Sequence, residues 1–336
     1  MKTKHIIIHV LAVLLALPLM GTSARALSIT IEVLETFDYP GTGNLTRPQK
    51  INDKNEIVGI FVDSSGVTRG FTRAADGTFS APIVEPNDTG NFTEGRGINN
   101  SATICGDYSG SDGLFHGFFL SGGTFTEYDV ADSDGTEVLG INNAGDFAGT
   151  YVPSGVGVFQ AFVNIGGSVI PIVIPDATGF SGAYQLNASN QFVGYYTDSG
   201  AINHGFYLDN GGTLRFPVDP DGSTGTILFG LNNRAWVVGR FSDSAGATHG
   251  LLFIDANHFV VFDFPGSTFT SLNGINQMNY ICGRYIDSSG IEHGILARAR
   301  RSAADEPGLK VRTLSPSSAV RPASPSPAVP VHLPAS

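Results

Sequence analysis

The chain has 336 residues, a formal net charge of −11 and 43 glycines, and 15% of its residues are charged. The acidic excess repels phosphate backbones and anionic lipid, which argues against nucleic-acid binding and against a role on membrane surfaces. Calcium, or a cationic or neutral partner, remains compatible with this charge.

Residues 1–26 have the pattern of a signal peptide. Lys2 and Lys4 precede an apolar stretch from Ile6 to Met20, and the small residues Ala24 and Ala26 follow at the cleavage positions. The stretch is too short and badly flanked for a membrane span, and no cysteine follows it for lipid attachment. We therefore expect export, with a mature chain that begins near Leu27, is secreted or periplasmic, and does not insert into a membrane.

A four-residue anchor recurs six times in the chain, at a spacing of about 45 residues. The anchors are KIND at Lys50 to Asp53, GINN at Gly97 to Asn100, GINN at Gly140 to Asn143, QLNA at Gln185 to Ala188, GLNN at Gly230 to Asn233 and GINQ at Gly274 to Gln277. Self-similarity at a fixed period indicates a repeat architecture. We assign residues 27–298 to one six-repeat domain.

A strand is predicted after each anchor. Glycine stands seven residues after every anchor Asn, at Gly59, Gly106, Gly149, Gly194, Gly239 and Gly283. An aromatic residue stands nine after it, at Phe61, Tyr108, Tyr151, Tyr196, Phe241 and Tyr285. The surrounding runs, such as EIVGIFVD and QFVGYYTD, are rich in β-formers.

A DSSG-like turn leads into a second predicted strand, which begins with a recurring triplet at Arg69, His116, Gln160, His204, His249 and His293. If Asp63 faces Arg69 across an antiparallel hairpin, Phe61 must face Phe71. The same register pairs Tyr196 with Phe206, Phe241 with Leu251 and Tyr285 with Ile295.

A further strand follows, as in TFTEYDV from Thr124 and HFVVFDF from His258, so each repeat supplies about four short antiparallel strands. No window has a sustained helical period, and the class is all-β. Period and strand count predict a six-bladed β-propeller. The segment Ile29 to Pro40 ends in FDYPG and resembles FDFPG at Phe262 to Gly266, so the N-terminal strand is predicted to complete the last blade and close the ring.

The segments GINNAGDFAGTY, YTDSGAINHGF and YIDSSGIEHG resemble the HAF family of probable extracellular repeats, named for a His-Ala-Phe triplet. The resemblance covers essentially the whole of residues 27–298 and implies bacterial export and a repeat fold, with no catalytic residues carried over. This chain departs from the pattern, because the triplet is mostly HGF, with Arg69 in the first repeat and Gln160-Ala161-Phe162 in the third.

The triplet histidines are predicted to be structural, because equivalent positions lie on different blades and do not converge on one ion. Asp198, Asp243 and Asp287 each precede a histidine by six residues, and Asp63 precedes Arg69 by six, which indicates a polar pair closing each hairpin. The second repeat breaks this rule with Gly110. Cys105 and Cys282 occupy a position that is Val or Ala elsewhere, and we expect two buried thiols too far apart for a disulfide.

The connections between repeats are where a ligand would bind in a propeller. ADSDG at Ala131 to Gly135, DPDG at Asp219 to Gly222, PNDTG at Pro86 to Gly90 and PDATG at Pro175 to Gly179 offer oxygen ligands for calcium, although ordinary turns use the same residues. Phe92, Phe180 and Phe269 also lie there. Packing between blade tops is the favoured role for these rings, and stacking on sugars is the alternative.

Residues 299–336 are rich in Ser, Pro and Ala and are predicted to be a disordered tail, either a tether or an inert extension. It lacks a hydrophobic stretch that would serve as an anchor.

No nucleophile elbow, phosphate loop, HExxH or paired-cysteine motif occurs in the sequence, so we assign no catalytic, cofactor-binding or metal-ligating residue and no cofactor. The leading hypothesis is a secreted binding or interaction module, expected to be a monomer, whose partner is a glycan or a protein. A glycan-acting hydrolase or lyase with carboxylates at the propeller mouth is the alternative, and a structural surface or matrix protein is the third. Converging carboxylates in a deep pocket would favour the enzyme, an aromatic platform the binder, and a flat mouth the structural role.

Overall fold

The computed structural model describes residues 8–12, 29–255, 258–301 and 329–330. Within these ranges every regular element is a β-strand, which confirms the all-β prediction. The part of the chain that the structure describes holds no helix that could span a membrane. Most of the predicted signal peptide and most of the predicted disordered tail lie outside the described residues.

The strands of the repeats follow one another in chain order. The first repeat forms β3 (Thr42–Ile51), β4 (Ile57–Asp63) and β5 (Thr68–Arg73). The second forms β6 (Thr93–Ile98), β7 (Ile104–Ser109), β8 (Phe115–Ser121) and β9 (Thr124–Tyr128). The third forms β10 (Ser133–Ile141), β11 (Phe147–Pro153), β12 (Gln160–Ile165) and β13 (Ser168–Pro171).

The remaining repeats have the same order. The fourth forms β14 (Ser181–Leu186), β15 (Phe192–Thr197), β16 (Asn203–Leu208) and β17 (Thr213–Val218). The fifth forms β18 (Ser223–Leu231), β19 (Val237–Asp243), β20 (Thr248–Asp255) and β21 (His258–Phe262). The sixth forms β22 (Phe269–Ile275), β23 (Tyr280–Ile286) and β24 (Glu292–Arg301).

Repeats two to five are therefore blades of four antiparallel strands, as predicted. The first repeat differs, because isolated bridges from Gly70 to Ile83 and from Arg73 to Phe79 stand in place of a fourth strand. Single parallel bridges, Thr248 to Phe269 and Glu292 to Leu45, join the fifth, sixth and first repeats into one mixed sheet of 12 strands.

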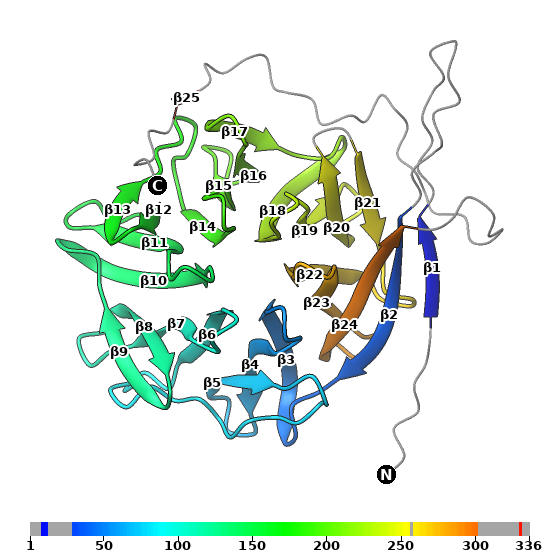
Figure 1. Cartoon of the computed structure of the whole chain (residues 1–336), viewed down its shortest axis with the longest axis horizontal. Coiled ribbons are helices and arrows are strands. Elements are labelled where there is room, and N and C mark those ends of the chain that lie inside the picture. The colour runs from blue at the N-terminus through cyan, green and yellow to red at the C-terminus, as the bar shows by residue number, and fades with distance from the viewer. Residues whose placement is uncertain (1–7, 13–28, 256–257, 302–328, 331–336) are drawn as a thin grey trace.

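Strands from the two ends of the chain add to the edges of these blades. β2 (Ile29–Phe37) runs antiparallel along β24, and Figure 1 shows the two side by side in blue and orange. β1 (Ile8–Ala12) pairs with the outer edge of β2. β25 (Val329–Pro330) pairs with β17, so this part of the predicted disordered tail is a strand, and β24 extends beyond the predicted domain end at residue 298.

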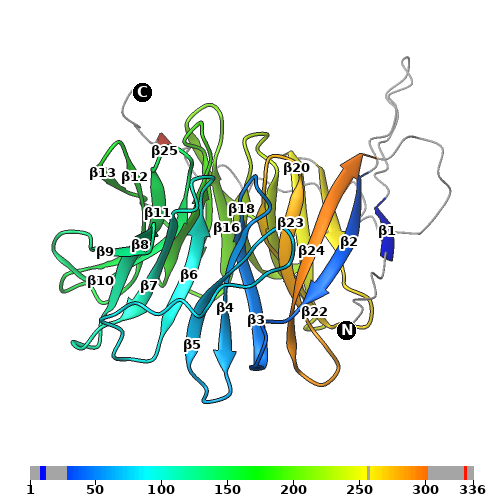
Figure 2. The same ribbon diagram turned by 60° about the horizontal axis from the view of Figure 1, so that its bottom comes forward.

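The strand sets are arranged round a common centre, with β3, β6, β10, β14, β18 and β22 nearest to it (Figure 1). Turned by 60°, the same strands are seen more from the side, so that more of their length is visible (Figure 2). Buried apolar side chains pack between neighbouring repeats, as where Val58 and Ile83 of the first repeat contact Ile104 and Phe118 of the second. No single blade could bury both of its apolar faces, so stacking against a neighbour is obligatory.

Each innermost strand carries a β-bulge three residues before its anchor Asn. The bulged residues are Gln49, Arg96, Leu139, Tyr184, Phe229 and Asn273. A bulge adds one residue to one strand and changes the direction of its side chains. The innermost strands thus present one irregular residue per repeat at the same level of the fold.

The predicted hairpin register is wrong. Phe61 lies opposite Arg69, and Phe71 lies opposite Gly59; in the same way Tyr196 faces His204, Phe241 faces His249 and Tyr285 faces His293. The reason is that Asp63 starts the turn, where its backbone N–H donates to the Val67 carbonyl, and only its side chain reaches Arg69.

This register explains the glycine seven residues after each anchor Asn. A Cβ atom at Gly59 would lie 2.3 Å from the Arg47 carbonyl oxygen and 2.9 Å from the Phe71 ring. Such contacts are impossible without moving the backbone of the innermost strand. The glycine therefore allows the second strand to approach the first while the ring of the third covers it.

Candidate functional site

The six anchor asparagines form a closed circle of hydrogen bonds, which we call the anchor circle. Each side-chain Nδ2 donates to the backbone carbonyl of the next repeat's anchor Asn. The bonds run Asn52 to Asn99 (3.0 Å), Asn99 to Asn142 (3.4 Å), Asn142 to Asn187 (3.3 Å), Asn187 to Asn232 (3.2 Å), Asn232 to Asn276 (3.2 Å) and Asn276 back to Asn52 (2.9 Å). Each Oδ1 also accepts backbone N–H groups of its own turn, as Asn52 does from Lys54 and Glu56. An amide side chain has a separate acceptor and donor, so it can accept within its own turn through Oδ1 and donate to the next repeat through Nδ2.

A second set of bonds uses the residue after each anchor Asn. The N–H groups of Asp53, Asn100, Ala188, Asn233 and Gln277 each donate to the side-chain oxygen of the next repeat's residue at this position, at 2.8–3.0 Å. The set is broken at one place, because Ala188 has no side-chain acceptor for the N–H of Asn143. The anchor turns are therefore a scaffold that is nearly complete in its own hydrogen bonds.

The anchor turns surround a small cavity of about 60 Å³. Such a volume has room for a few water molecules, and it is less than half that of an engineered cavity that binds benzene. Asp53 is the one carboxylate among its lining residues, and both of its oxygens accept hydrogen bonds, from Gln277 and Asn100. This end of the fold offers little space for a sugar ring and no pair of carboxylates.

The triplet histidines each bridge two aspartates, an arrangement we call the clasp. Nε2 contacts the aspartate at the hairpin and Nδ1 contacts one at the end of the outermost strand. The partners of His204 are Asp198 (3.2 Å) and Asp219 (2.5 Å), those of His249 are Asp243 (3.3 Å) and Asp263 (2.7 Å), and those of His293 are Asp287 (3.4 Å) and Asp38 (2.9 Å). The predicted hairpin pairs are confirmed, and the second aspartate was missed.

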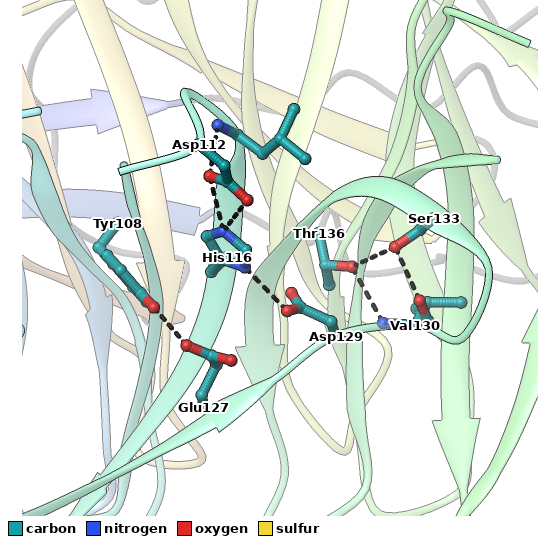
Figure 3. A network of polar contacts seen from close by, with 9 residues as sticks. Tyr108, Asp112, His116, Glu127, Asp129, Val130, Ser133 and Thr136 are labelled. Carbon is teal, nitrogen blue, oxygen red and sulfur yellow. Dashed lines mark hydrogen bonds and ion pairs between the residues drawn. The ribbon is translucent and has the colours of Figure 1, made fainter. Parts of the chain in front are cut away.

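In the second repeat, Asp112 takes the place that the comparison of repeats gave to Gly110. His116 Nε2 lies 3.1 Å from Asp112, and Nδ1 lies 2.8 Å from Asp129 (Figure 3). Burial opposes a charge on this ring, but the hydrogen bonds to Asp129 and Asp112 outweigh it and raise the pKa of His116. The aspartate is therefore present in this repeat too, two residues later in the turn.

A third carboxylate, Glu127, lies beside this clasp and accepts a hydrogen bond from the Tyr108 hydroxyl (Figure 3). Ligand atoms of His116, Glu127 and Asp129 lie within 4.8 Å of one another, close enough to share a metal ion. Both ring nitrogens are already engaged, however, and three other repeats have the same clasp without a third carboxylate. The clasp is best explained as a structural link between the hairpin and the outermost strand.

The centre of the fold holds charged residues that the sequence analysis did not single out. On one side Arg96 contacts three carboxylates, which we call the acidic half: Asp107 at 2.9 Å, Glu137 at 3.9 Å, and Glu94. Asp107 is fully buried and its Oδ2 has no hydrogen-bond partner among the described residues. Burial raises the pKa of Asp107 well above its usual value and also raises that of Glu137.

On the other side lie Arg47, Arg240 and Arg284 with one carboxylate, Glu292, which pairs with Arg47 and Arg284; we call this group the basic half. Glu292 accepts from Arg47 Nε at 2.7 Å and Nη2 at 3.0 Å, and from Arg284 Nη1 at 2.6 Å. Arg240 lies 5.2 Å from the centre of the Phe269 ring and 5.5 Å from that of Phe229. Arg284 also lies over Phe269, at 4.8 Å.

Aromatic residues of the fourth repeat lie between the two halves. Tyr195 stacks on Phe180 with ring centres 4.9 Å apart, and Tyr184 contacts Phe229 of the fifth repeat at 5.3 Å. Lys50 of the first repeat reaches across the centre, with its Nζ 5.9 Å from the Tyr184 ring. Burial lowers the pKa of Lys50 to about 8.

In two of the connections that the sequence offered as a ligand site, an aspartate is engaged by bonds from nearby turns. Asp88 accepts from Phe92 N–H and the Thr93 hydroxyl, and Asp134 accepts from the Ser154 hydroxyl and Gly155 N–H. Phe180 packs on Phe159 of the third repeat and Phe269 lies beside Arg240 of the fifth, so these two rings pack between repeats as expected, whereas Phe92 packs on Phe115 of its own repeat. Both cysteines are buried free thiols, and burial raises the pKa of each to about 12.

One sequence signal pointed to the central residues. Eight residues after each anchor Asn, between the glycine and the aromatic, stand Ile60, Asp107, Thr150, Tyr195, Arg240 and Arg284. Charged residues at one position of an otherwise apolar strand indicate a polar environment on that side. The position is occupied by five different residue types in the six repeats, with Arg in both the fifth and the sixth. This variation was not used in the sequence analysis, because the repeat was defined by its constant positions.

Comparisons with known proteins give a fold likeness only. No protein-family model matches the chain, and no curated protein matches it. Among solved structures, it resembles a lectin of Aleuria aurantia in complex with Fucα1-6GlcNAc at 12% identity and a TM-score of 0.48, over 79% of this chain and 99% of the lectin. It resembles TolB from Acinetobacter baumannii at 12% identity and a TM-score of 0.45, over 87% of this chain and 65% of TolB. The β-propeller domain of the Trilobed protease from Pyrococcus furiosus has 8% identity and a TM-score of 0.42, over 83% and 96%.

Proposed function

We propose that this chain is a secreted binding module, built as a six-bladed propeller that the N-terminal strand closes. Three contacts support closure: β2 lies along β24, Asp38 completes the clasp of His293, and Asn276 returns the anchor circle to Asn52. The Asp38 contact is the same one that the outermost strand makes within the second, fourth and fifth repeats. The N-terminal strand therefore takes the outermost place in the sixth repeat.

One observation carries the binding role: the scaffold positions are nearly uniform around the fold, whereas the two central positions together hold a different pair of residues in each repeat. The bulged residues and the position eight residues after each anchor Asn include acidic, basic, aromatic and apolar side chains. A purely structural repeat has no need for an asymmetric polar centre, and burying charge there is costly unless it is used or fully paired. We place the ligand at the end of the centre where the connections lie, because the anchor circle occupies the other end.

The test is the melting temperature of the purified protein with a panel of neutral and acidic oligosaccharides, calcium and chelator, since a ligand of the native state raises it. A matched pair locates the site: Tyr195→Phe removes a central hydroxyl, and Tyr151→Phe removes one that bonds Gln160 away from the centre. A ligand shift that weakens in the first variant and not in the second supports the proposal. No shift with any ligand, or equal loss in both variants, contradicts a central binding site.

A glycan-acting hydrolase is the second candidate, favoured by the acidic half. The raised pKa of Asp107 and Glu137 is what a general acid requires. If the Glu137→Gln variant still binds the glycan but no longer cleaves it, that result would support the hydrolase. Binding without turnover in the wild type would leave the binding module.

Export and family membership are also proposals. Expression of the full chain in a secreting host should yield a product whose N-terminus lies near Leu27, as measured by intact mass. Retention of residues 1–26 in the exported product would contradict the signal-peptide assignment. Membership in the HAF family is proposed only on the basis of the sequence segments that resemble it.

A further inference from the structure

The basic half holds more hydrogen-bond donors than the protein uses. An arginine side chain has five N–H donors. Glu292 takes two from Arg47 and one from Arg284, whereas Arg240 has no ion pair or hydrogen bond among the described residues. The Nε of Arg284 is buried without a partner, in a side chain that is only 9% exposed.

The arginines also carry more charge than one carboxylate balances. The positive charge of Arg47 contributes to lowering the pKa of both Arg240 and Arg284, after burial, which is the larger cause. Like charges held together in a partly buried site cost free energy unless an anion compensates them. The surplus is notable in a chain whose formal net charge is −11.

We propose that Arg47, Arg240 and Arg284 form an anion-binding site that takes a carboxylate group of the ligand. This inference rests on the proposed binding function and names the chemistry of its ligand. Planar guanidinium groups bind a carboxylate through paired N–H donors, and such charge-assisted bonds are roughly twice as strong as hydrogen bonds between neutral groups. Two sources share this chemistry, a small polycarboxylate and a sugar acid within a glycan.

Solvent can reach the site. The innermost strands run from the connections toward the anchor circle, and Arg47 lies five residues before Asn52, while Phe269 is the first residue of β22. The Arg47 side chain is 28% exposed. The arginines therefore lie toward the connection end, away from the small cavity among the anchor turns.

The opposing explanation is that Arg240 is a packing residue, held by Phe229 and Phe269. The two explanations predict different effects of Arg240→Gln on the melting temperature of the unliganded protein. If Arg240 only packs, Arg240→Gln loses cation–π contacts and lowers the melting temperature without ligand. If Arg240 is held for an anion, its loss relieves repulsion, so the unliganded protein keeps or gains stability and loses its response to the anion.

The experiment measures binding of three probes at constant ionic strength: trigalacturonate, citrate and the neutral galactotriose. The readouts are the melting temperature and the Nε–H resonances of ¹⁵N-labelled arginine. Variants are Arg240→Gln, Arg240→Lys, which keeps the charge without the paired donors, and Arg215→Gln as control. Arg215 pairs with Asp209 and is 54% exposed, so its loss changes the net charge equally but elsewhere.

We expect saturable shifts of the Arg240 and Arg284 resonances with trigalacturonate or citrate and none with galactotriose. Tighter binding of trigalacturonate would identify a glycan acid, and tighter binding of citrate a small polycarboxylate. Arg240→Gln should weaken binding by about tenfold or more, Arg240→Lys less, and Arg215→Gln not at all. The anion site is overturned if trigalacturonate or citrate binds Arg240→Gln with unchanged affinity. It is also overturned if the wild type shows no saturable response to trigalacturonate or to citrate. Binding of galactotriose in that case would leave the proposed binding function standing.

Discussion

The side-chain amide nitrogen of Asn276 lies 2.9 Å from the backbone carbonyl oxygen of Asn52, 224 residues away in the chain. Bonds of the same kind join each pair of consecutive anchors, so the last repeat contacts the first in the way that every other repeat contacts the next one in the chain. A local turn residue thereby also acts as a long-range link.

The gap beside Ala188 can be filled. Ala188→Asn would supply an acceptor for the N–H of Asn143 and complete the second set of bonds. One partly exposed hydrogen bond should add about 1 kcal/mol, or about 2–4 °C in melting temperature for a chain of this size. Differential scanning calorimetry would measure it.

The matched control is Ser189→Asn, which places the same side chain one residue later, where it is not positioned to accept from the N–H of Asn143. Asn233→Ala should have the opposite effect, because it removes the acceptor for the N–H of Ala188. Equal melting temperatures for Ala188→Asn and Ser189→Asn would refute the account of the gap.

Gly194 should not tolerate a methyl group. A Cβ there would lie 2.0 Å from the Gly182 carbonyl oxygen and 2.5 Å from the Phe206 ring, so Gly194→Ala must displace the innermost strand. We expect a loss of about 3 kcal/mol or more, measured by urea unfolding. Gly225→Ala is the control, because its Cβ would meet nothing nearer than 3.8 Å. Similar losses in the two variants would show that the close approach is not the cause.

Glu292→Gln should destabilise the protein strongly. The side chain is 7% exposed and its loss of charge leaves Arg47 and Arg284 without a counter-ion, at a cost of about 3–5 kcal/mol. Asp209→Asn, at the exposed pair with Arg215, should cost about 1 kcal/mol or less. Urea unfolding near neutral pH measures both, and comparable losses would mean that the central pair is not the stronger one.

The Glu292 effect should depend on pH. Burial opposes its charge, but the hydrogen bond from Arg47 and the charge of Arg284 outweigh burial and lower its pKa. A carboxylate with a lowered folded pKa stabilises the fold above its unfolded pKa, and the contribution disappears as pH falls through the folded value. The difference between wild type and Glu292→Gln should therefore shrink in acid; a constant difference would contradict this.

The clasp should stabilise the fold most under mildly acidic conditions. Burial works against a charge on His204, yet its bonds to Asp219 and Asp198 raise its pKa, while the turn N–H of Ile202 and His204 lower that of Asp198. The histidine contributes below its unfolded pKa and loses its contribution as pH rises through the raised folded value. The aspartate contributes above its unfolded pKa and loses its contribution as pH falls.

The measurement is the melting temperature of wild type and His204→Gln from pH 4 to pH 9, at about one-unit steps. The destabilisation by the variant should be largest near pH 5 to 6, between the two unfolded pKa values of about 4 and 6.5, and should decline in alkali. His258→Gln, at an exposed pair with Asp255, is the control. A variant effect that grows with pH would contradict a charged clasp.

Local regularities made much of the fold predictable. The Asn at each anchor, the glycine seven residues later and the β-rich runs around it set the repeat, the strands and the hairpin pairs of Asp63 with Arg69 and Asp198 with His204. These features depend on residues within about ten positions of one another, where turn chemistry and strand propensity act directly. The hairpin register was missed because the Asp63 side chain reaches Arg69 from within the turn, without facing it in the ladder.

By itself, then, the sequence determined an all-β repeat protein, with its anchors, turns and buried cysteines, because the same local residue pattern occurs in all six repeats. Only the tertiary structure decided that the anchor asparagines bond to one another in a circle, that Arg47 and Arg284 meet at Glu292, and that Arg240 and Arg284 lie over the same Phe269 ring. Those groups lie up to 245 residues apart in the chain. Their meeting depends on how the repeats stack round the centre, and no spacing within a single repeat encodes it.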